Sequence, residues 1–157
     1  VGLVYCSAEA ISKYQVDAVK AELEGMGLTA TLFAFADTND LQSVPQAAAD
    51  ASDVIYVPTD NAVASGTGII DGICQAAGVP IIAGEEGICA GCGVATLSIS
   101  YYDLGVATGE MAAKILKGEA SVSEMEIGYA ATVTPKYNAA NCEALGLTVP
   151  AGYEAIG

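Results

Sequence analysis

The sequence contains no histidine and no arginine, so its only basic residues are five lysines. Against these stand 19 acidic residues, and the formal net charge is -14. Nucleic-acid backbones and anionic lipid surfaces are bound by clustered Lys and Arg, so a nucleic acid is excluded as a main partner. The lack of histidine also removes the commonest general base and the commonest metal ligand, which counts against an enzyme and against a metal site.

Long hydrophobic runs are absent as well, although 53% of the residues are apolar. A helix that spans a bilayer needs about 20 apolar residues in succession, so we expect no membrane insertion. The sequence also lacks the phosphate-binding GxxxxGKS or GxxxxGKT loop, the nucleophile motif GxSxG and a GxGxxG motif after a strand. It therefore predicts no cofactor and gives an enzyme no specific support. Residue 1 is a valine that enters a strand directly, and from this we expect the chain to be part of something longer.

Short strands and helices alternate through the first half of the chain. The pattern predicts strands at 2–6, 28–35, 53–57 and 79–83 and helices at 10–26, 38–51 and 62–77. Gly27 and Gly78 stop two of these helices, and Pro45 is expected to kink the second helix or to begin its main segment. Strands that alternate with helices through short loops indicate a parallel sheet with right-handed crossovers. The predicted fold class is therefore α/β, with a parallel Rossmann-like sheet flanked by helices.

The second half of the chain is less regular. We expect a Gly- and Cys-bearing loop at 84–93, strands at 94–99 and 127–134, an amphipathic helix at 101–116, a short helix at 138–145 capped by Asn138, and a tail at 146–157. One face of the amphipathic helix carries apolar side chains, namely Leu104, Met111, Ala112, Ile115 and Leu116.

Polar residues follow the predicted strands, at the edge where ligands bind in open α/β sheets. After the strand at 53–57 come Thr59, Asp60 and Asn61. The Thr59 hydroxyl and the backbone N–H groups of the next helix are suited to a carboxylate, and Asp60 is suited to an ammonium. Capping of that helix, worth about 1 kcal/mol, is the simpler explanation for any one of these residues. Only their coincidence with polar residues at the other strand ends favours a ligand site.

Other strand ends carry further candidates. Glu85 and Glu86 are adjacent carboxylates that repel each other unless one faces solvent or a cationic ligand group. A solvated acidic loop is the alternative: it is favoured for Glu86, and for Glu85 it stands level with a ligand contact. Ser7 and Glu9 follow the first strand in the same way. Three tyrosines near strand ends are suited either to an apolar pocket or to the rim of the core: Tyr5, Tyr101 and Tyr102.

Cys89 and Cys92 form a CxxC pair, which is typical of a redox pair or of half a zinc site. A structural zinc needs four ligands, and the other thiols, at Cys6, Cys74 and Cys142, form no second pair. A thioredoxin-type pair opens a helix, whereas a strand is expected soon after this one. The preferred interpretation is a loop disulfide or two free thiols, and no metal is predicted.

Four stretches taken together resemble the substrate-binding proteins of ABC importers: IYVPTDNAVAS, PIIAGEEG, GVATLSISYYDLGVATGEMAAKILKGE and NAANCEALGLTVP. The resemblance covers nearly the whole chain and is to the family with periplasmic-binding-protein type I architecture that includes tryptophan and tyrosine binders. It implies a two-lobed clamp that closes on a small ligand, an aromatic or other amino acid. It also implies that the protein is not an enzyme, that an ABC transporter permease is its partner, and that it is extracytoplasmic, either lipid-anchored at the cell surface or periplasmic.

The resemblance further implies that this chain lacks the amino-terminal lobe. Residues 1–85 then form the core of the second lobe, residues 86–126 cross back to the first lobe, and residues 127–157 return. The apolar face of the helix at 101–116 is therefore expected to be covered by another chain, by a separate lobe, or by self-association or a segment swap through residues 101–117. By resemblance, the ligand contacts of this half are Ser7, Thr59, Asp60, Asn61, Glu85 and Tyr101.

Two other functions stay open at this point. The ligand-sensing domain of a transcription regulator shares the clamp architecture, but it needs a basic DNA-binding segment that this sequence does not contain. A small thiol redox protein that works through Cys89 and Cys92 is the less favoured alternative.

Overall fold

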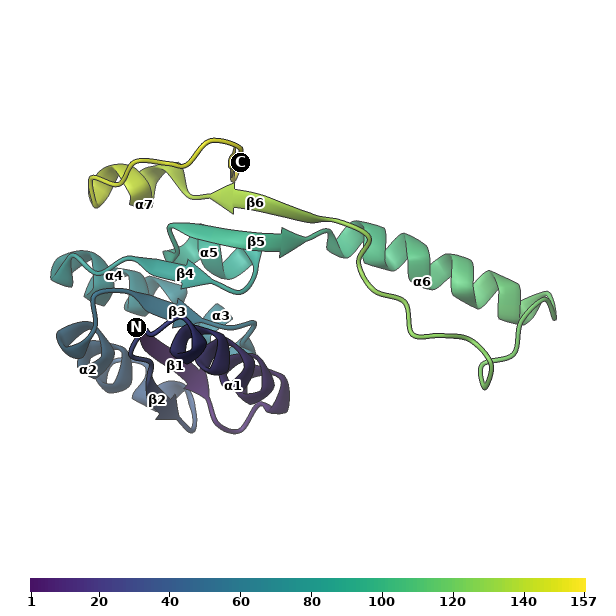
Figure 1. Ribbon diagram of the computed structural model, residues 1–157, viewed down its shortest axis with the longest axis horizontal. Coiled ribbons are helices and arrows are strands. Elements are labelled where there is room, and N and C mark those ends of the chain that lie inside the picture. The colour runs from purple at the N-terminus through teal and green to yellow at the C-terminus, as the bar shows by residue number, and fades with distance from the viewer.

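One seven-stranded sheet organises the computed structural model, which describes residues 1–157 (Figure 1). The strands lie in the order β2-β1-β3-β4-β5-β6-β7, and all neighbours are parallel except β5 and β6, which are antiparallel. Their bounds are Gly2–Cys6 (β1), Thr31–Phe35 (β2), Ile55–Val57 (β3), Ile81–Ala83 (β4), Ala95–Ile99 (β5), Val133–Tyr137 (β6) and Glu154–Ala155 (β7). The predicted α/β class with a mostly parallel sheet is confirmed.

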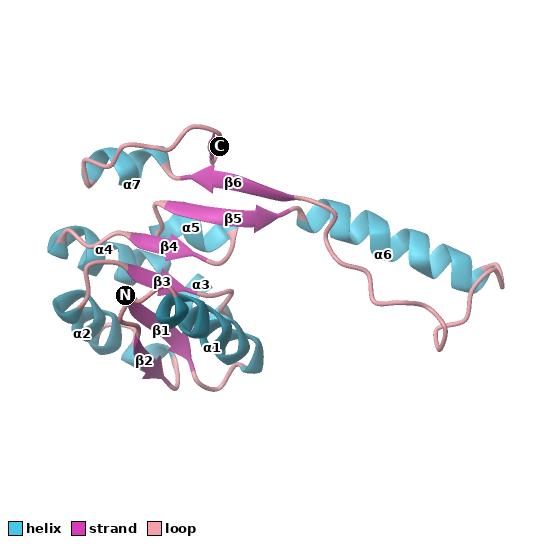
Figure 2. Cartoon of the chain, in the orientation of Figure 1, coloured by secondary structure: helices cyan, strands magenta, loops and turns pink.

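Helices connect most of the strands (Figure 2). They are α1 (Ala10–Gly25), a 3-10 turn η1 (Thr38–Asp40), α2 (Ser43–Ala51), α3 (Asn61–Ala64), α4 (Thr67–Ala77), α5 (Glu86–Cys92), α6 (Tyr101–Leu116) and α7 (Ala139–Ala144). Pro45 lies in the first turn of α2, where its missing N–H costs no helical hydrogen bond. Gly78 ends α4 in the left-handed conformation with φ 70°, as its position in the sequence predicts.

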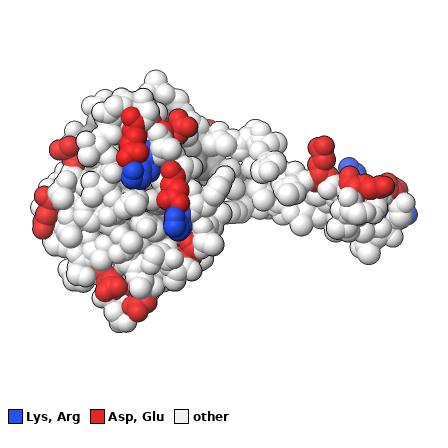
Figure 3. All heavy atoms as spheres, turned by 60° about the horizontal axis from the view of Figure 1, so that its bottom comes forward, with Lys and Arg blue, Asp and Glu red and all other residues white.

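Acidic side chains are scattered over the surface, and lysines on the face shown in Figure 3 lie only beside acidic side chains. In two such pairs on α1, Lys13–Asp17 and Lys20–Glu24, the two partners are one helical turn apart. Exposed pairs of this kind contribute little to stability because water and salt screen the charges. This face therefore carries no positive region that would attract a polyanion.

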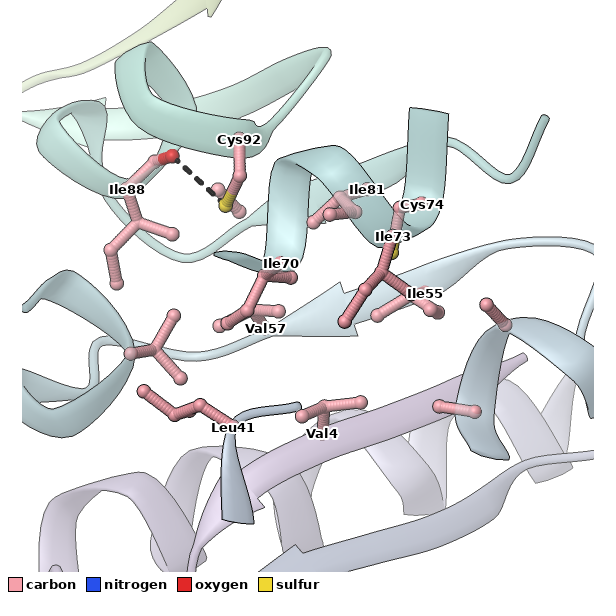
Figure 4. Packing of buried hydrophobic residues seen from close by; sticks show 14 of the residues in the cluster. Val4, Leu41, Ile55, Val57, Ile70, Ile73, Cys74, Ile81, Ile88 and Cys92 are labelled. Atoms are coloured by element: carbon pink, nitrogen blue, oxygen red, sulfur yellow. Dashed lines mark hydrogen bonds between the residues drawn. The ribbon is translucent and has the colours of Figure 1, made fainter. Parts of the chain in front are cut away.

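Alternate residues of β1, an interior strand of the sheet, face opposite sides of the sheet. Val4 and Cys6 belong to the main core, an 18-residue cluster that the strands share mainly with α2, α4 and α5 (Figure 4). Leu3 and Tyr5 point to the opposite face, where Val16 of α1 packs against them. The short apolar run at the start of the chain is thus buried on both faces, which is the pattern of a central parallel strand.

The segment after β4 differs from its prediction as a loop. Residues 86–92 form helix α5, and Glu85 caps its N-terminus. Gly87 and Gly91 lower the helix propensity of this segment, but Gly91 has a packing role, because a Cβ atom there would lie 2.4 Å from the Thr67 hydroxyl at the start of α4. Close packing against α4 therefore decides the conformation, and the CxxC pair lies within a helix.

Other boundaries differ from their predictions as well: the helix predicted at 38–51 is the turn η1 followed by α2, and the strand predicted at 28–35 begins at Thr31. The helix predicted at 62–77 is split into α3 and α4 at Gly66, where a Cβ atom would lie 2.4 Å from the Leu41 side chain. The strand predicted at 127–134 is β6 at Val133–Tyr137, which pairs with β5 from Ile99–Val133 to Ala95–Tyr137. Pro135 is tolerated in β6 because β7 pairs only with Lys136 and Tyr137.

Helix α6 and residues 117–132 extend away from the sheet as an arm (Figure 1). No residue of α6 is buried. Met111 and Ile115 line a groove of about 500 Å³ with Val122, Met125 and Ile127 from the rest of the arm, whereas Leu116 is 87% exposed. The arm therefore covers the predicted apolar face of α6 only in part.

Candidate ligand-binding site

The loop after β3 is fixed by the carboxylate of Asp60, which is 1% exposed. Its Oδ2 accepts hydrogen bonds from the backbone N–H of Cys6 at 2.7 Å and the hydroxyl of Ser12 at 2.6 Å, and its Oδ1 accepts one from the N–H of Val63 at 2.9 Å. Asp60 thus caps α3 and ties it to the end of β1 and to α1. Because this carboxylate is almost fully buried and accepts three hydrogen bonds from the protein, capping accounts for Asp60, and its contact with a ligand ammonium stays a prediction.

The first backbone N–H groups of α3 are occupied by a second carboxylate, that of Glu9. Its Oε2 accepts hydrogen bonds from the N–H and the Nδ2 of Asn61 at 3.0 Å and 2.9 Å, and its Oε1 accepts one from the N–H of Ala62 at 3.0 Å. Burial alone would raise the pKa of Glu9, but these hydrogen bonds outweigh it and lower the pKa below its usual value. The backbone N–H of Thr59 likewise donates to Gln15 Oε1 at 2.8 Å. The chain itself therefore fills the place predicted for a ligand carboxylate.

Glu85 and Glu86 separate into two roles. The Glu85 carboxylate accepts hydrogen bonds from the N–H of Gly87 at 2.8 Å and from that of Ile88. The Glu86 Oε2 forms an ion pair with Lys136 Nζ at 2.7 Å. The adjacent carboxylates thus have different partners, which relieves the repulsion that the sequence predicts.

A hollow of about 350 Å³ lies where β3 and β4 end. Its walls come from α3, α5 and the start of α6: Thr59, Asp60, Asn61, Ala64, Glu85, Gly87, Ile88 and Tyr101. Partial burial, and after it the negative charge of Glu85, raise the pKa of Tyr101, so its hydroxyl stays protonated at neutral pH. A smaller hollow of about 280 Å³ adjoins at Tyr101 and includes Lys136 and Glu86.

Hydrogen-bond acceptors dominate the hollow at the ends of β3 and β4. Of the two carboxylates that line the hollow, Asp60 is almost fully buried and Glu85 is partly exposed. The Thr59 hydroxyl and the Asn61 Oδ1 have no hydrogen-bond partner within the protein. Carboxylate and carbonyl oxygens can only accept, so this wall is suited to a group that donates hydrogen bonds and carries positive charge.

The structure places five of the six predicted contacts at this hollow. Ser7 is the exception, because its hydroxyl donates to the carbonyl oxygen of Phe35 at 3.0 Å, at the end of β2. Sequence reasoning missed Gly87 and Ile88, since α5 was expected to be a loop. The spacing that reveals them is a Glu before a short segment with apolar residues one turn apart, Ile88 and Cys92, which is typical of a capped helix.

All five cysteines are buried and none forms a disulfide. Burial raises the pKa of Cys89 to about 12 and that of Cys92 to about 12, and nearby carboxylates and thiols add to this in each case. Thiols with such pKa values carry almost no thiolate at neutral pH, and the thiolate is the reactive form. The structure brings no three potential metal ligands together.

The profile of the ABC transporter substrate binding protein family matches residues 1–152. The chain belongs to the ABC transporter substrate-binding protein family. Among the curated members, the tyrosine-binding protein of Clostridioides difficile (strain R20291) is 29% identical over 127 residues, which are 81% of this chain and 36% of that protein.

Solved structures of substrate-binding proteins share the fold. An ABC domain from Streptococcus pneumonia in complex with L-Trp has a TM-score of 0.88 and 34% identity, over 99% of this chain and 54% of that chain. A ligand-free, open substrate-binding protein with adhesive properties from Clostridium difficile has a TM-score of 0.79 and 34% identity, over 99% and 53%. A conserved domain protein from Vibrio cholerae has a TM-score of 0.88 and 28% identity, over 98% and 53%. This chain therefore spans about half the length of the solved proteins it matches.

Proposed function

We propose that this chain supplies one lobe of the solute-binding component of an ABC importer, and that its hollow holds the ammonium end of a small amino-acid ligand. The observation that carries the proposal is the wall of Glu85, Asn61 and Thr59, beside which the backbone N–H groups of Thr59, Asn61 and Ala62 already donate within the protein. Glu85 supplies the negative charge, and the Asn61 Oδ1 and Thr59 hydroxyl supply further acceptors. The function is binding and release, with no chemical step.

The ligand carboxylate is assigned to the opposite lobe. Glu9 occupies the N–H groups of Asn61 and Ala62, and the one lysine near the hollow, Lys136, is paired with Glu86. A carboxylate placed at this wall would meet the negative charge of Glu85 and the Asn61 Oδ1, which costs free energy with no positively charged donor to compensate. The ligand is thus oriented with its amine toward this chain.

An aromatic amino acid is the ligand class that we favour. Ile88, Ala64 and the ring of Tyr101 give the hollow an apolar side beside its acceptor wall. A zwitterion with an apolar side chain matches that division. The printed names of two relatives, a tyrosine-binding protein and a domain in complex with L-Trp, support the same class.

The three segments of the chain have separate places in the proposed clamp. Residues 1–85 carry the core of this lobe together with α5 and β5 of the segment 86–126, the arm in that segment crosses to the other lobe, and residues 127–157 return to the sheet through β6. We assign an ABC transporter permease as the partner and an extracytoplasmic location, lipid-anchored or periplasmic. None of the helices combines the length and the apolar character that crossing a bilayer requires.

A thermal-shift screen of the two-lobed protein tests this function. The panel holds the twenty amino acids, nucleosides and simple sugars, because a ligand at about 100 times its dissociation constant stabilises the folded state by about 2.7 kcal/mol. We expect L-Trp or L-Tyr to give the largest rise in melting temperature and their des-amino analogues to give little. A response to sugars or nucleosides alone would refute the proposed ligand class.

A further inference from the structure

Hydrogen bonds from Asn61 to Glu9 fix which end of the Asn61 carboxamide faces the hollow. Glu9 is the residue before α1 and lies 52 positions away from Asn61 in the chain. Its Oε2 accepts hydrogen bonds from both the backbone N–H and the Nδ2 of Asn61. A carboxylate can only accept hydrogen bonds, so the donor end of the carboxamide must turn toward Glu9. The acceptor end, Oδ1, is left as the group that Asn61 can offer to the hollow that it lines.

We propose that Glu9 is a specificity-determining positioning residue, which holds Asn61 as a hydrogen-bond acceptor and thereby makes the hollow select an ammonium over a carboxylate. This inference rests on the proposed function and deepens it. Glu9 itself does not line the hollow, so it acts through Asn61 and through the N–H groups that it occupies.

Glu9 can perform this role because it stays ionised. Its lowered pKa reflects the three donors that converge on it, and none of its hydrogen bonds involves a positively charged side chain. A neutral amide at position 9 would have one carbonyl oxygen for three donors, and its own NH2 group would favour the Oδ1 of Asn61. In Glu9→Gln the Asn61 carboxamide is therefore expected to turn over and present a donor to the hollow.

The orientation of Asn61 is testable in this chain without any ligand. In the NMR spectrum of the wild type, one Nδ2 proton of Asn61 should show the downfield shift and slow exchange of a hydrogen bond to a carboxylate. Glu9→Gln should lose that signature, whereas Glu22→Gln, an exposed change of the same kind on α1, should keep it. An unchanged Asn61 amide signal in Glu9→Gln would overturn the inference.

The selectivity is tested in the two-lobed protein with L-Trp and its des-amino analogue, indole-3-propionate. Glu9→Gln should weaken L-Trp binding by about tenfold, the value of one charge-assisted hydrogen bond, and should leave indole-3-propionate unchanged or slightly tighter. Adding Asn61→Asp to Glu9→Gln should restore part of the L-Trp affinity, because the reversed pair again offers an acceptor. A purely structural role predicts equal loss for both ligands, and that result would overturn the inference.

Failure of the proposed function looks different from failure of this inference. If the wild type binds no amino acid, the function is wrong and the selectivity part of the inference falls with it. If the wild type binds L-Trp and Glu9→Gln binds it equally well, the function stands and the inference alone is overturned.

Discussion

Three donors from three different segments converge on the buried carboxylate of Asp60, which therefore holds the end of β1, the start of α1 and the start of α3 together. Removing it would leave the Cys6 N–H and the Ser12 hydroxyl buried without partners. Leaving such groups unsatisfied costs more than the hydrogen bonds themselves contribute.

We predict that Asp60→Ala lowers the free energy of unfolding by about 2 to 4 kcal/mol. Asp53→Ala, an exposed aspartate before β3, is the matched control and should change the value by less than about 0.5 kcal/mol. Urea denaturation followed by circular dichroism measures both. Equal stabilities for the two variants would show that Asp60 is not the structural centre of this loop.

Because the pKa of Glu9 is lowered in the folded state, we predict that the contribution of Glu9 to the free energy of unfolding depends on pH. Because the folded-state pKa lies below the usual 4.5, the stabilisation from Glu9 is fully present above that value and is lost as the pH falls through the folded-state pKa. The stability difference between wild type and Glu9→Gln should therefore be constant near neutral pH and shrink in acid. Denaturation curves from about pH 7 to about pH 3 measure it, and a difference that does not change with pH would contradict the geometry.

At the site, the sequence predicted the position of the polar residues better than their roles. Strand ends of a parallel sheet meet at one edge, so Thr59, Glu85 and Tyr101 could be brought together in advance. Which oxygen accepts from which donor depends on side chains far along the chain, as with Glu9 and Asn61. That assignment needs the three-dimensional structure.

Helices and strands whose apolar residues repeat regularly could be predicted from the sequence, whereas those fixed by close packing could not. Helix α6 was predicted at its observed bounds because its apolar residues repeat with helical spacing. Helix α5 was missed because two glycines argue against a helix locally, while its packing on α4 requires one of them. The start of β6 was misplaced because its position follows from pairing with β5, which no local pattern reveals.

Substitutions at Gly84 and Gly72 test whether the chain after β4 must pack closely against the chain after β3. A Cβ atom on Gly84 would lie 2.7 Å from the backbone nitrogen of Thr59, whereas one on Gly72 of α4 would meet nothing within 4 Å. Gly84→Ala should lower the free energy of unfolding by about 1 to 3 kcal/mol through overpacking. Gly72→Ala should raise it by about 0.5 to 1 kcal/mol, because glycine weakens a helix interior. Changes of the same sign in the two denaturation midpoints would contradict this packing.

The whole molecule leaves two apolar surfaces without a cover. One is the arm, where Leu116, Val122 and Ile127 are 87%, 72% and 78% exposed. The other is the sheet face beyond α1, where the strand register places Ile82 and Leu97, 39% and 61% exposed, on the same side as Leu3 and Tyr56. A parallel sheet is normally covered on both faces, so both surfaces fit a lobe that is completed by further protein.

We predict that this chain alone associates through the arm. Each large apolar side chain left in water costs about 1.5 to 3 kcal/mol, which favours contact between copies. Leu116→Glu should reduce association in sedimentation velocity experiments without changing the unfolding midpoint at concentrations where the chain is monomeric, since Leu116 is 87% exposed. Met26→Glu, an exposed apolar residue outside the arm, is the control and should leave association unchanged. A wild-type chain that stays monomeric at all concentrations would contradict the prediction.

The most direct test of the account is a calorimetric titration of the two-lobed protein with L-Trp, in the wild type, in Glu85→Gln and in Glu86→Gln. The two variants remove the same charge at neighbouring positions, but only Glu85 lines the hollow, while Glu86 is paired with Lys136. We predict that Glu85→Gln weakens binding by at least about tenfold and that Glu86→Gln changes it by less than about threefold. Equal affinities for wild type and Glu85→Gln would show that the ends of β3 and β4 do not hold the ligand amine.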